Sequence, residues 1–298
     1  MATLNYATQY AQALAQAYPY VLNFGDLYNT ENDTRYRWIN GKTIEIPSIS
    51  TTGRVDSDRD TIATATRNYD NAWEPKTLSN QRKWSTLVHP MDVNQTNQVA
   101  SIQNITKVYN EEQKFPEMDA YLVSKVYSDW TGQGKSAKTI NLTVDNILET
   151  FDDLMAEMDE DRVPANGRIL YVTSAVKKLL KRADGITRTV NVKDNNSDIN
   201  REVSRLDEVK IVPVPSTLMK TAYNFTTGWV PGGTAKQIQM FLVHPSAIIT
   251  PVSYQFAQLD PPSAGSEGKY IYFEESFEDV FILNKKAGGI KFVLPAEG

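Results

Sequence analysis

Apolar side chains at helical spacing run through two long stretches of the chain. Between residues 97 and 130 they predict a long helix, which Pro116 interrupts because proline disfavours helix at Phe115 yet suits a first helical turn. We therefore expect one long kinked helix or two helices in series. A second helix is expected to begin at Thr143, a candidate N-cap. Its apolar stripe contains Val144, Ile147, Leu148, Phe151, Leu154, Met155 and Met158.

Shorter apolar runs predict strands in the second half of the chain. These runs are 169–172, 210–214, 238–243, 248–252, 269–273, 280–284 and 290–294. A short basic helix is expected at 174–183, and an Ala- and Gln-rich helix at 3–18, ended by Pro19. Mixed helices and strands of this kind indicate an α+β fold.

Residues 36–90 read as a long two-stranded excursion with a polar tip. The first part contains Asn40-Gly41, a strong two-residue turn signal between residues 36–39 and 43–46. The returning part, residues 73–96, is polar and extended and ends just before the long helix. A two-stranded hairpin is marginally stable alone, so its Trp and Leu side chains need a surface to lie on.

Charges of both signs alternate along the tip of this excursion, from Arg54 to Asp70. One interpretation is solubility. The other is pairing with complementary charges of a neighbouring molecule, which sets partner choice and register more than affinity. Each exposed pair contributes only about 0–1 kcal/mol, so such contacts need repetition to matter.

Composition narrows the possible functions. The chain has 298 residues, no Cys and a formal net charge of −5. The absence of Cys excludes disulfides and thiolate metal sites. No apolar run approaches the roughly 20 residues that span a bilayer, and we see no signal peptide. The acidic balance is unlike that of a protein that grips DNA through its phosphates.

Catalytic and metal-binding motifs are weak. Two Asp-rich segments, beginning at Asp56 and Asp194, resemble the start of a calcium loop, but their sixth positions are Thr61 and Ile199 instead of Gly. The Gly-rich segment at Gly232 lacks phosphate-loop spacing. We therefore expect no catalytic residues, no metal site and no cofactor.

Four segments, in order, resemble major capsid proteins of tailed bacteriophages with the HK97-type fold. Trp84 to Thr96 is similar to the junction between that family's extended loop and its spine helix, although His89-Pro90 and Gln95 replace residues that are often acidic there. Residues 115–121, Phe-Pro-Glu-Met-Asp-Ala-Tyr, resemble an element of the spine-helix region. The other two segments are residues 143–172 and the paired strands from Glu274 to Leu294.

The resemblance implies a domain organisation. It divides the chain into an N-terminal arm (1–34), an extended β-hairpin loop (35–92), a peripheral domain with a long spine helix (93–138 and 269–298) and an axial domain (139–268). The extended loop would then contact neighbouring subunits. The candidate contact residues are Arg54, Asp56, Arg59, Trp73, Lys76, Arg82 and Trp84.

The resemblance also implies partners and a location. Copies of the chain would form pentamers and hexamers, which close into an icosahedral shell around double-stranded DNA without sequence-specific binding. A separate scaffolding protein and a portal would take part, and no membrane is involved. Assembly would occur in the bacterial host cytoplasm, and the product would be the virion capsid. We do not predict a lysine–asparagine cross-link, because no reactive set aligns.

Three alternatives stay open at this stage. An encapsulin-like shell that holds an enzyme cargo would have a similar fold. Another virion component, such as a tail-tube subunit, would form tubes instead of closed spheres. An enzyme, such as a hydrolase, is disfavoured because no strong catalytic motif is present.

Overall fold

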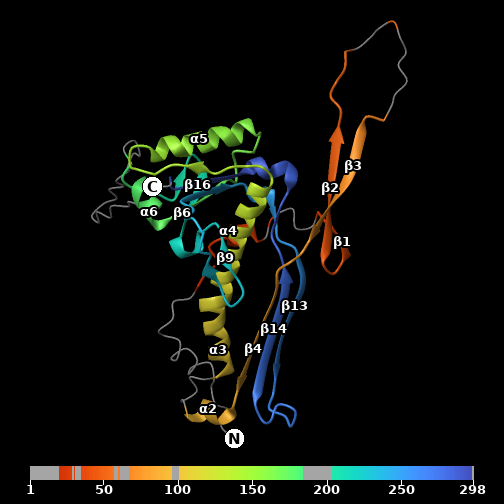
Figure 1. Cartoon of the computed structure of the whole chain (residues 1–298), viewed down its shortest axis with the longest axis vertical. Coiled ribbons are helices and arrows are strands. Elements are labelled where there is room, and N and C mark those ends of the chain that lie inside the picture. Colours follow the sequence, from red (N-terminus) through yellow and green to blue (C-terminus); the bar gives the residue numbers. More distant parts are fainter. Residues whose placement is uncertain are drawn as a thin grey trace, which may run out of the picture.

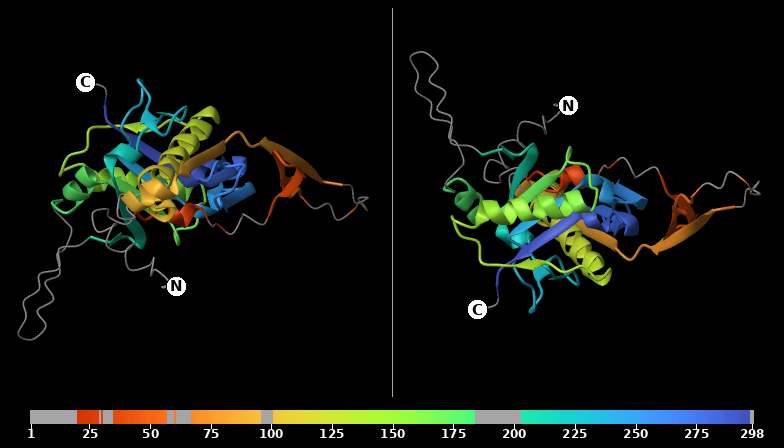
Figure 2. Two further views of the ribbon diagram at one scale, coloured as in Figure 1. Left: turned by 90° about the horizontal axis from the view of Figure 1, so that it is seen from below. Right: turned by 90° about the horizontal axis from the view of Figure 1, so that it is seen from above.

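A computed structural model describes residues 20–28, 30, 35–56, 60, 67–95, 101–183 and 203–296. The helix expected at 3–18 lies outside the described residues. Figure 1 shows a long helix along the molecule's long axis, a sheet running beside it, and a hairpin that projects beyond the body. The views in Figure 2 show the same hairpin extending away from the rest of the described chain.

A central sheet forms the main body of the fold. Its strand order is β5 (Lys138–Thr139), β16 (Ile290–Leu294), β11 (Met240–Val243), β6 (Ile169–Thr173), β8 (Val209–Val214) and β7 (Arg205–Leu206). Every residue of β6 and β11 is buried. These strands are continuous apolar runs because both faces of the sheet are covered.

Helices α5 (Ile147–Glu160) and α6 (Ser174–Leu180) cover one face of the central sheet. Helix α5 buries Ile147, Phe151, Leu154 and Met158, as its predicted stripe requires. The predicted start at Thr143 is wrong, because the helix begins at Ile147. Thr143 N donates to Asn146 Oδ1 (2.7 Å) and Asn146 N donates to Thr143 Oγ1 (3.4 Å), which holds a separate turn ahead of the helix.

The long helix covers the other face. The long helix consists of α3 (Ile102–Tyr109), a π-helical turn (Asn110–Lys114) and α4 (Phe115–Gly132). A separate short helix, α2 (Pro90–Gln95), precedes it in the chain. The interruption predicted at Pro116 is confirmed, in the form of this widened turn directly before the proline. A π-helical turn accommodates a proline that has no N–H to donate to the preceding turn.

The core between the long helix and the central sheet is rich in aromatic side chains. Phe241 of β11 stacks on Phe292 with ring centroids 4.6 Å apart, and Trp130 of α4 meets Phe292 edge-on at 5.2 Å. The Trp130 indole N–H also donates to the carbonyl oxygen of Ala287 (3.2 Å). These contacts fix the long helix on the central sheet.

A lateral sheet runs beside the long helix. Its order is β13 (Val252–Asp260), β14 (Tyr270–Glu278) and β4 (Gln81–Val88), all antiparallel. Smaller pairs complete the described part of the fold: β12 (Ile248–Ile249) with β15 (Phe281–Ile282), and β9 (Tyr223–Asn224) with β10 (Val230–Pro231).

The projecting hairpin consists of β1 (Arg37–Asn40), β2 (Thr43–Thr51) and β3 (Tyr69–Thr77), in that order. The turn predicted at Asn40-Gly41 is confirmed, since β1 and β2 pair directly across it. The prediction of one excursion over residues 36–90 is wrong in its last part. The chain leaves the hairpin after Thr77, and β4 joins the lateral sheet instead, because β14 offers it a ladder from Tyr270 to Phe277.

Two prolines lie inside the hairpin strands. Pro47 is opposite Trp73, and Pro75 is opposite Glu45. These two pairs are of the same type, because pair types alternate along an antiparallel ladder. Proline has no N–H to donate, so it fits the non-hydrogen-bonded pairs, in which the N–H groups point away from the partner strand. Each proline therefore removes an N–H donor from the outer edge of its own strand.

Candidate functional site

The hairpin presents an apolar face that the described residues of its own chain leave uncovered. Cross-strand pairing places Pro47, Ile49, Tyr69 and Trp73 on one face. Of these side chains, Ile49 is 65%, Tyr69 is 55% and Trp73 is 40% exposed. The guanidinium of Arg37 lies over the Trp73 ring at 3.8 Å, a cation–π contact that shields only part of the indole. Isolated hairpins with both faces in water are marginal, so this face is suited to contact another molecule.

The base of the hairpin is anchored to the body. Ile44 and Leu78 are buried with Ile249, Phe277 and Phe281 in a small core of their own. This core holds one end of the hairpin while the other end extends away from the body.

Polar contacts add to this anchor. Lys76 Nζ donates to Asn284 Oδ1 (3.0 Å), and Asn284 Nδ2 donates to Glu74 Oε2 (2.6 Å). Lys285 Nζ donates to the carbonyl oxygen of Ile49 (2.5 Å). Lys76, a predicted contact with a neighbouring subunit, is therefore engaged within its own chain.

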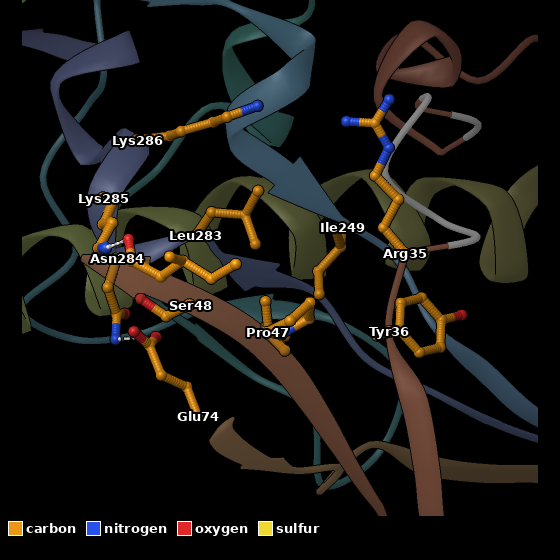
Figure 3. Close-up of a pocket in the computed structure, with 12 residues that line it drawn as sticks. Arg35, Tyr36, Pro47, Ser48, Glu74, Ile249, Leu283, Asn284, Lys285 and Lys286 are labelled. Atoms are coloured by element: carbon orange, nitrogen blue, oxygen red, sulfur yellow. Dashed lines mark hydrogen bonds between the residues drawn. The ribbon is translucent and has the colours of Figure 1, made fainter. Parts of the chain in front are cut away.

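An open cavity of about 250 Å³ lies beside this anchor. Figure 3 shows its wall of Pro47, Ile249 and Leu283, with the side chains of Arg35 and Lys286 on opposite sides above it. Glu74 and Asn284 form a hydrogen-bonded pair at one end. The cavity thus combines an apolar wall with cationic side chains.

Arg82 and Trp84, two other predicted contact residues, face the long helix of their own chain. The Trp84 ring stacks on Tyr109 with centroids 3.8 Å apart and an interplanar angle of 6°. Arg82 Nε donates to Glu117 Oε1 (2.6 Å), and Arg82 Nη1 donates to the carbonyl oxygen of Phe225 (2.6 Å). The structure uses both side chains to attach β4 to the long helix, and a role toward a neighbour stays a prediction.

The remaining predicted contact residues lie far along the hairpin. Arg54 and Asp56 are exposed beyond the ends of β2 and β3, and Trp73 belongs to the apolar face. Arg59 lies outside the described residues. The six predicted contact residues that the structure describes are therefore not brought together at one place. Among these six, only Arg54, Asp56 and Trp73 are exposed on the projecting part of the hairpin.

The lateral sheet carries a second exposed apolar surface that the sequence analysis missed. Strand β13 was not predicted over its full length, and its register places Tyr254 and Phe256 on the face away from the long helix. Leu87 of β4 shares that face, and the three side chains are 47%, 39% and 61% exposed. The aromatic pair Tyr254 and Phe256, two residues apart, is the signal that could have indicated this face.

Buried carboxylates connect segments distant in sequence. Asp119 of α4 accepts hydrogen bonds from the Tyr20 hydroxyl (2.5 Å) and from the backbone N–H of Asn23 (2.9 Å). Burial raises the pKa of Asp119, and these hydrogen bonds oppose the shift. Asp279 accepts from Ser79 N (2.7 Å) and the Tyr121 hydroxyl (2.7 Å). Both carboxylates hold segments that are distant in sequence in place.

Other site types are not found in the described part of the chain. It contains no cluster of three or more His, Cys, Asp or Glu side chains that could hold a metal ion. Within the same residues, no helix combines the length and apolar character needed to cross a membrane.

Comparison with known proteins gives matches in structure only. No protein-family model matches the sequence, and no curated protein matches it. A solved structure from Mycobacterium phage Che8 has a TM-score of 0.64 and 13% identity, covering 94% of this chain and 93% of the other. The mature capsid structure of bacteriophage PhiM1 has a TM-score of 0.63 and 13% sequence identity, and the match covers 86% of this chain and 83% of the other. The capsid structure of Cyanophage P-SCSP1u has a TM-score of 0.63 and 11% sequence identity, and the match covers 95% of this chain and 90% of the other.

These likenesses span nearly the whole chain, so the chain has the fold of phage capsid proteins. The predicted fold class, an α+β fold of the HK97 type, is confirmed. The proposed domain boundaries stay a prediction.

Proposed function

We propose that this chain is a major capsid protein that assembles with copies of itself into an icosahedral shell enclosing phage DNA. The observation that carries the proposal is the agreement of nearly the whole fold with the capsid structures of PhiM1 and P-SCSP1u. A structural protein of this kind needs neither a catalytic group nor a cofactor.

The surfaces described above support self-association. The apolar face of the hairpin and the outer face of the lateral sheet are different patches, on two separate sheets. When one patch of a subunit binds a different patch of the next, the contact is heterologous, and a rotation that closes yields a ring. Pentamers and hexamers are such rings. Arg54, Asp56 and Trp73 are the predicted residues best placed to reach a neighbour.

The parts of the chain would divide the work of assembly. Within residues 35–92, the hairpin that ends at Thr77 would supply the extended loop. Residues 93–138 and 269–298 would supply the peripheral domain, and residues 139–268 the axial domain near the ring axis. Residues 1–34 would act as an arm. A scaffolding protein would guide assembly in the host cytoplasm and a portal would occupy one vertex. The net charge of −5 would keep enclosed DNA from adhering to the wall.

Electron microscopy of the protein produced in bacteria, alone and with its phage's scaffolding protein, tests the proposal. We expect closed spherical shells, with particles from infected cells containing DNA. Ile49→Asp, which places a charge on the apolar face of the hairpin, serves as the assembly-deficient control. Tubes would instead indicate a tail component, and shells filled with an enzyme would indicate a nanocompartment. A protein that stays monomeric under all these conditions would contradict self-assembly.

A further inference from the structure

Charged side chains cross the seam where β4 and β14 of the lateral sheet face the long helix. Arg82 of β4 pairs with Glu117 of α4 (2.6 Å), and Lys114 of the π-helical turn pairs with Glu274 of β14 (3.1 Å). All four side chains are partly exposed, from 10% to 33%. Partly exposed ion pairs are individually weak, so these two close the seam without locking it.

Packing along the seam is incomplete. Cavities of about 350, 30 and 40 Å³ follow it, and Met118 of α4 and Glu278 of β14 line all three. Atoms that line a void have no partner on that side to lose. Separating the sheet from the helix here therefore costs less than separating two closely packed layers.

One end of the seam is fixed more firmly. Asp279 accepts hydrogen bonds from Ser79 N (2.7 Å) and from the Tyr121 hydroxyl (2.7 Å), which tie the end of β14 to the segment that enters β4 and to α4. Phe277, near the same end of β14, is buried in the small core at the base of the hairpin. The sheet can therefore move away from the helix along the seam while this end stays in place.

Glu278 faces the seam with a poorly balanced charge. Within the described residues, no ion pair and no hydrogen bond reaches its side chain. Burial disfavours its ionised form, as do the charges of Glu117 and Asp279, and together they raise the pKa of Glu278 against the attraction of Lys114. The other titratable groups along the cavities that it lines are Arg82, Lys83, Glu274, Glu275, Tyr28, Tyr109 and Tyr121.

We propose that this seam is a pH-operated joint, which opens as Glu278 loses its proton and closes as Glu278 regains it. The ionised carboxylate repels Glu117 across the seam, whereas the neutral acid leaves the two ion pairs unopposed. Because its pKa is raised, Glu278 takes up the proton in mild acid, above the pH at which an ordinary carboxyl does so. The joint belongs to the subunit and stands apart from the proposed function. In a shell it would let one chain hold its lateral sheet at different angles to its long helix.

Oxidation of Met118 by hydrogen peroxide measures opening in the unmodified protein. A thioether has no proton to lose, so a change of its oxidation rate with pH reports access to the side chain. Met91, which is 56% exposed, is the internal reference, and the fully buried Met240 reports global unfolding. Peptide mass spectrometry of the unassembled subunit gives the rates. The rate of Met118 relative to Met91 should fall about fivefold between pH 7.5 and pH 5.5, while Met240 stays protected at both.

A substitution at Glu278 separates this carboxyl from other effects of pH. Glu278→Gln removes the charge and nearly keeps the shape, so Met118 should be oxidised slowly at both pH values. The matched control is Glu267→Gln, which removes one charge from the exposed turn between β13 and β14 and should behave as the parent does. A relative Met118 rate that is equal at the two pH values in the parent, or that changes as much in Glu278→Gln, would overturn the joint. Neither result depends on shell formation, so each leaves the proposed function standing.

Discussion

The central sheet and the projecting hairpin are both built of strands, yet they differ in what covers them. Every residue of β11 is buried, and Phe241 stacks between Tyr171 and Phe292 at 5.6 and 4.6 Å. In β3, Trp73 is 40% exposed and its described ring contact is with Arg37. The central sheet is completed by its own chain. The hairpin shows the same kind of apolar side chains without a covering layer, which is expected of a surface completed by a neighbour.

This difference predicts that substitutions in the two regions act on different equilibria. A change in the central sheet alters the free energy of unfolding of the subunit. A change on the apolar face of the hairpin alters association and leaves the subunit folded.

The largest loss of subunit stability is expected for Phe241→Ala. Truncating a buried aromatic side chain costs about 3–5 kcal/mol, because the apolar contact is lost and a cavity remains. Denaturant unfolding of the unassembled subunit would measure this loss, with Phe241→Leu as the milder control. A loss below about 1 kcal/mol would show that the central sheet is less tightly packed than the ring contacts indicate.

A loss of about 2 kcal/mol is expected for Trp84→Ala, since the ring stacks on Tyr109 of the long helix. This expectation distinguishes a Trp84 that attaches β4 to its own long helix from a Trp84 that contacts a neighbouring subunit. If Trp84 served only a neighbouring subunit, the unassembled variant would unfold at the same denaturant concentration as the parent. The matched control is Ser85→Ala, one position along on the opposite face of the same strand.

A gain in the free energy of unfolding near neutral pH, smaller than the losses above, is expected for Glu278→Gln. Burial raises the pKa of Glu278, as do the charges of Glu117 and Asp279, while Lys114 opposes the shift. Because the folded-state pKa lies above the unfolded one, this carboxyl favours the folded state most at low pH. That contribution is lost as pH rises through the folded pKa. The variant and its parent should therefore diverge as the pH is raised from 4 to 7, and parallel stability curves would contradict this.

The smallest effect on subunit stability, within about 0.5 kcal/mol, is expected for Ile49→Asp, because the side chain is 65% exposed. Shell formation, measured by sedimentation and electron microscopy, should nevertheless be lost. Ser50→Asp adds the same charge on the opposite face of β2 and should assemble. Equal assembly of the two variants would remove the distinction between the faces.

Local sequence patterns predicted the helices and strands whose buried side chains recur at a regular spacing along the chain. The stripe from Ile147 to Met158 and the run from Ile169 to Val172 gave α5 and β6, because burial on a fixed period is written directly in the residues. Asn40-Gly41 indicated the first turn of the hairpin through its local turn chemistry.

Long-range pairing was not accessible from those patterns. Trp84 pairs with Glu274, about 190 residues away, so nothing near β4 indicates that it leaves the hairpin. Arg82 and Trp84 were accordingly predicted to face a neighbour, whereas their described contacts are within the chain. The cavity at the hairpin base is a product of the same long-range folding, since Arg35, Ile249 and Lys285 meet only in three dimensions.

The positions of Pro47 and Pro75 affect how an exposed hairpin behaves before it meets a partner. A long free strand edge is a template on which further strands can add without limit, as in amyloid fibres. Each proline removes one donor from an outer edge of the hairpin, on opposite sides of the ribbon. Growth by edge-to-edge hydrogen bonding is therefore blocked on both sides. Side-chain contacts through the faces remain available, and these produce assemblies of finite size instead of fibres.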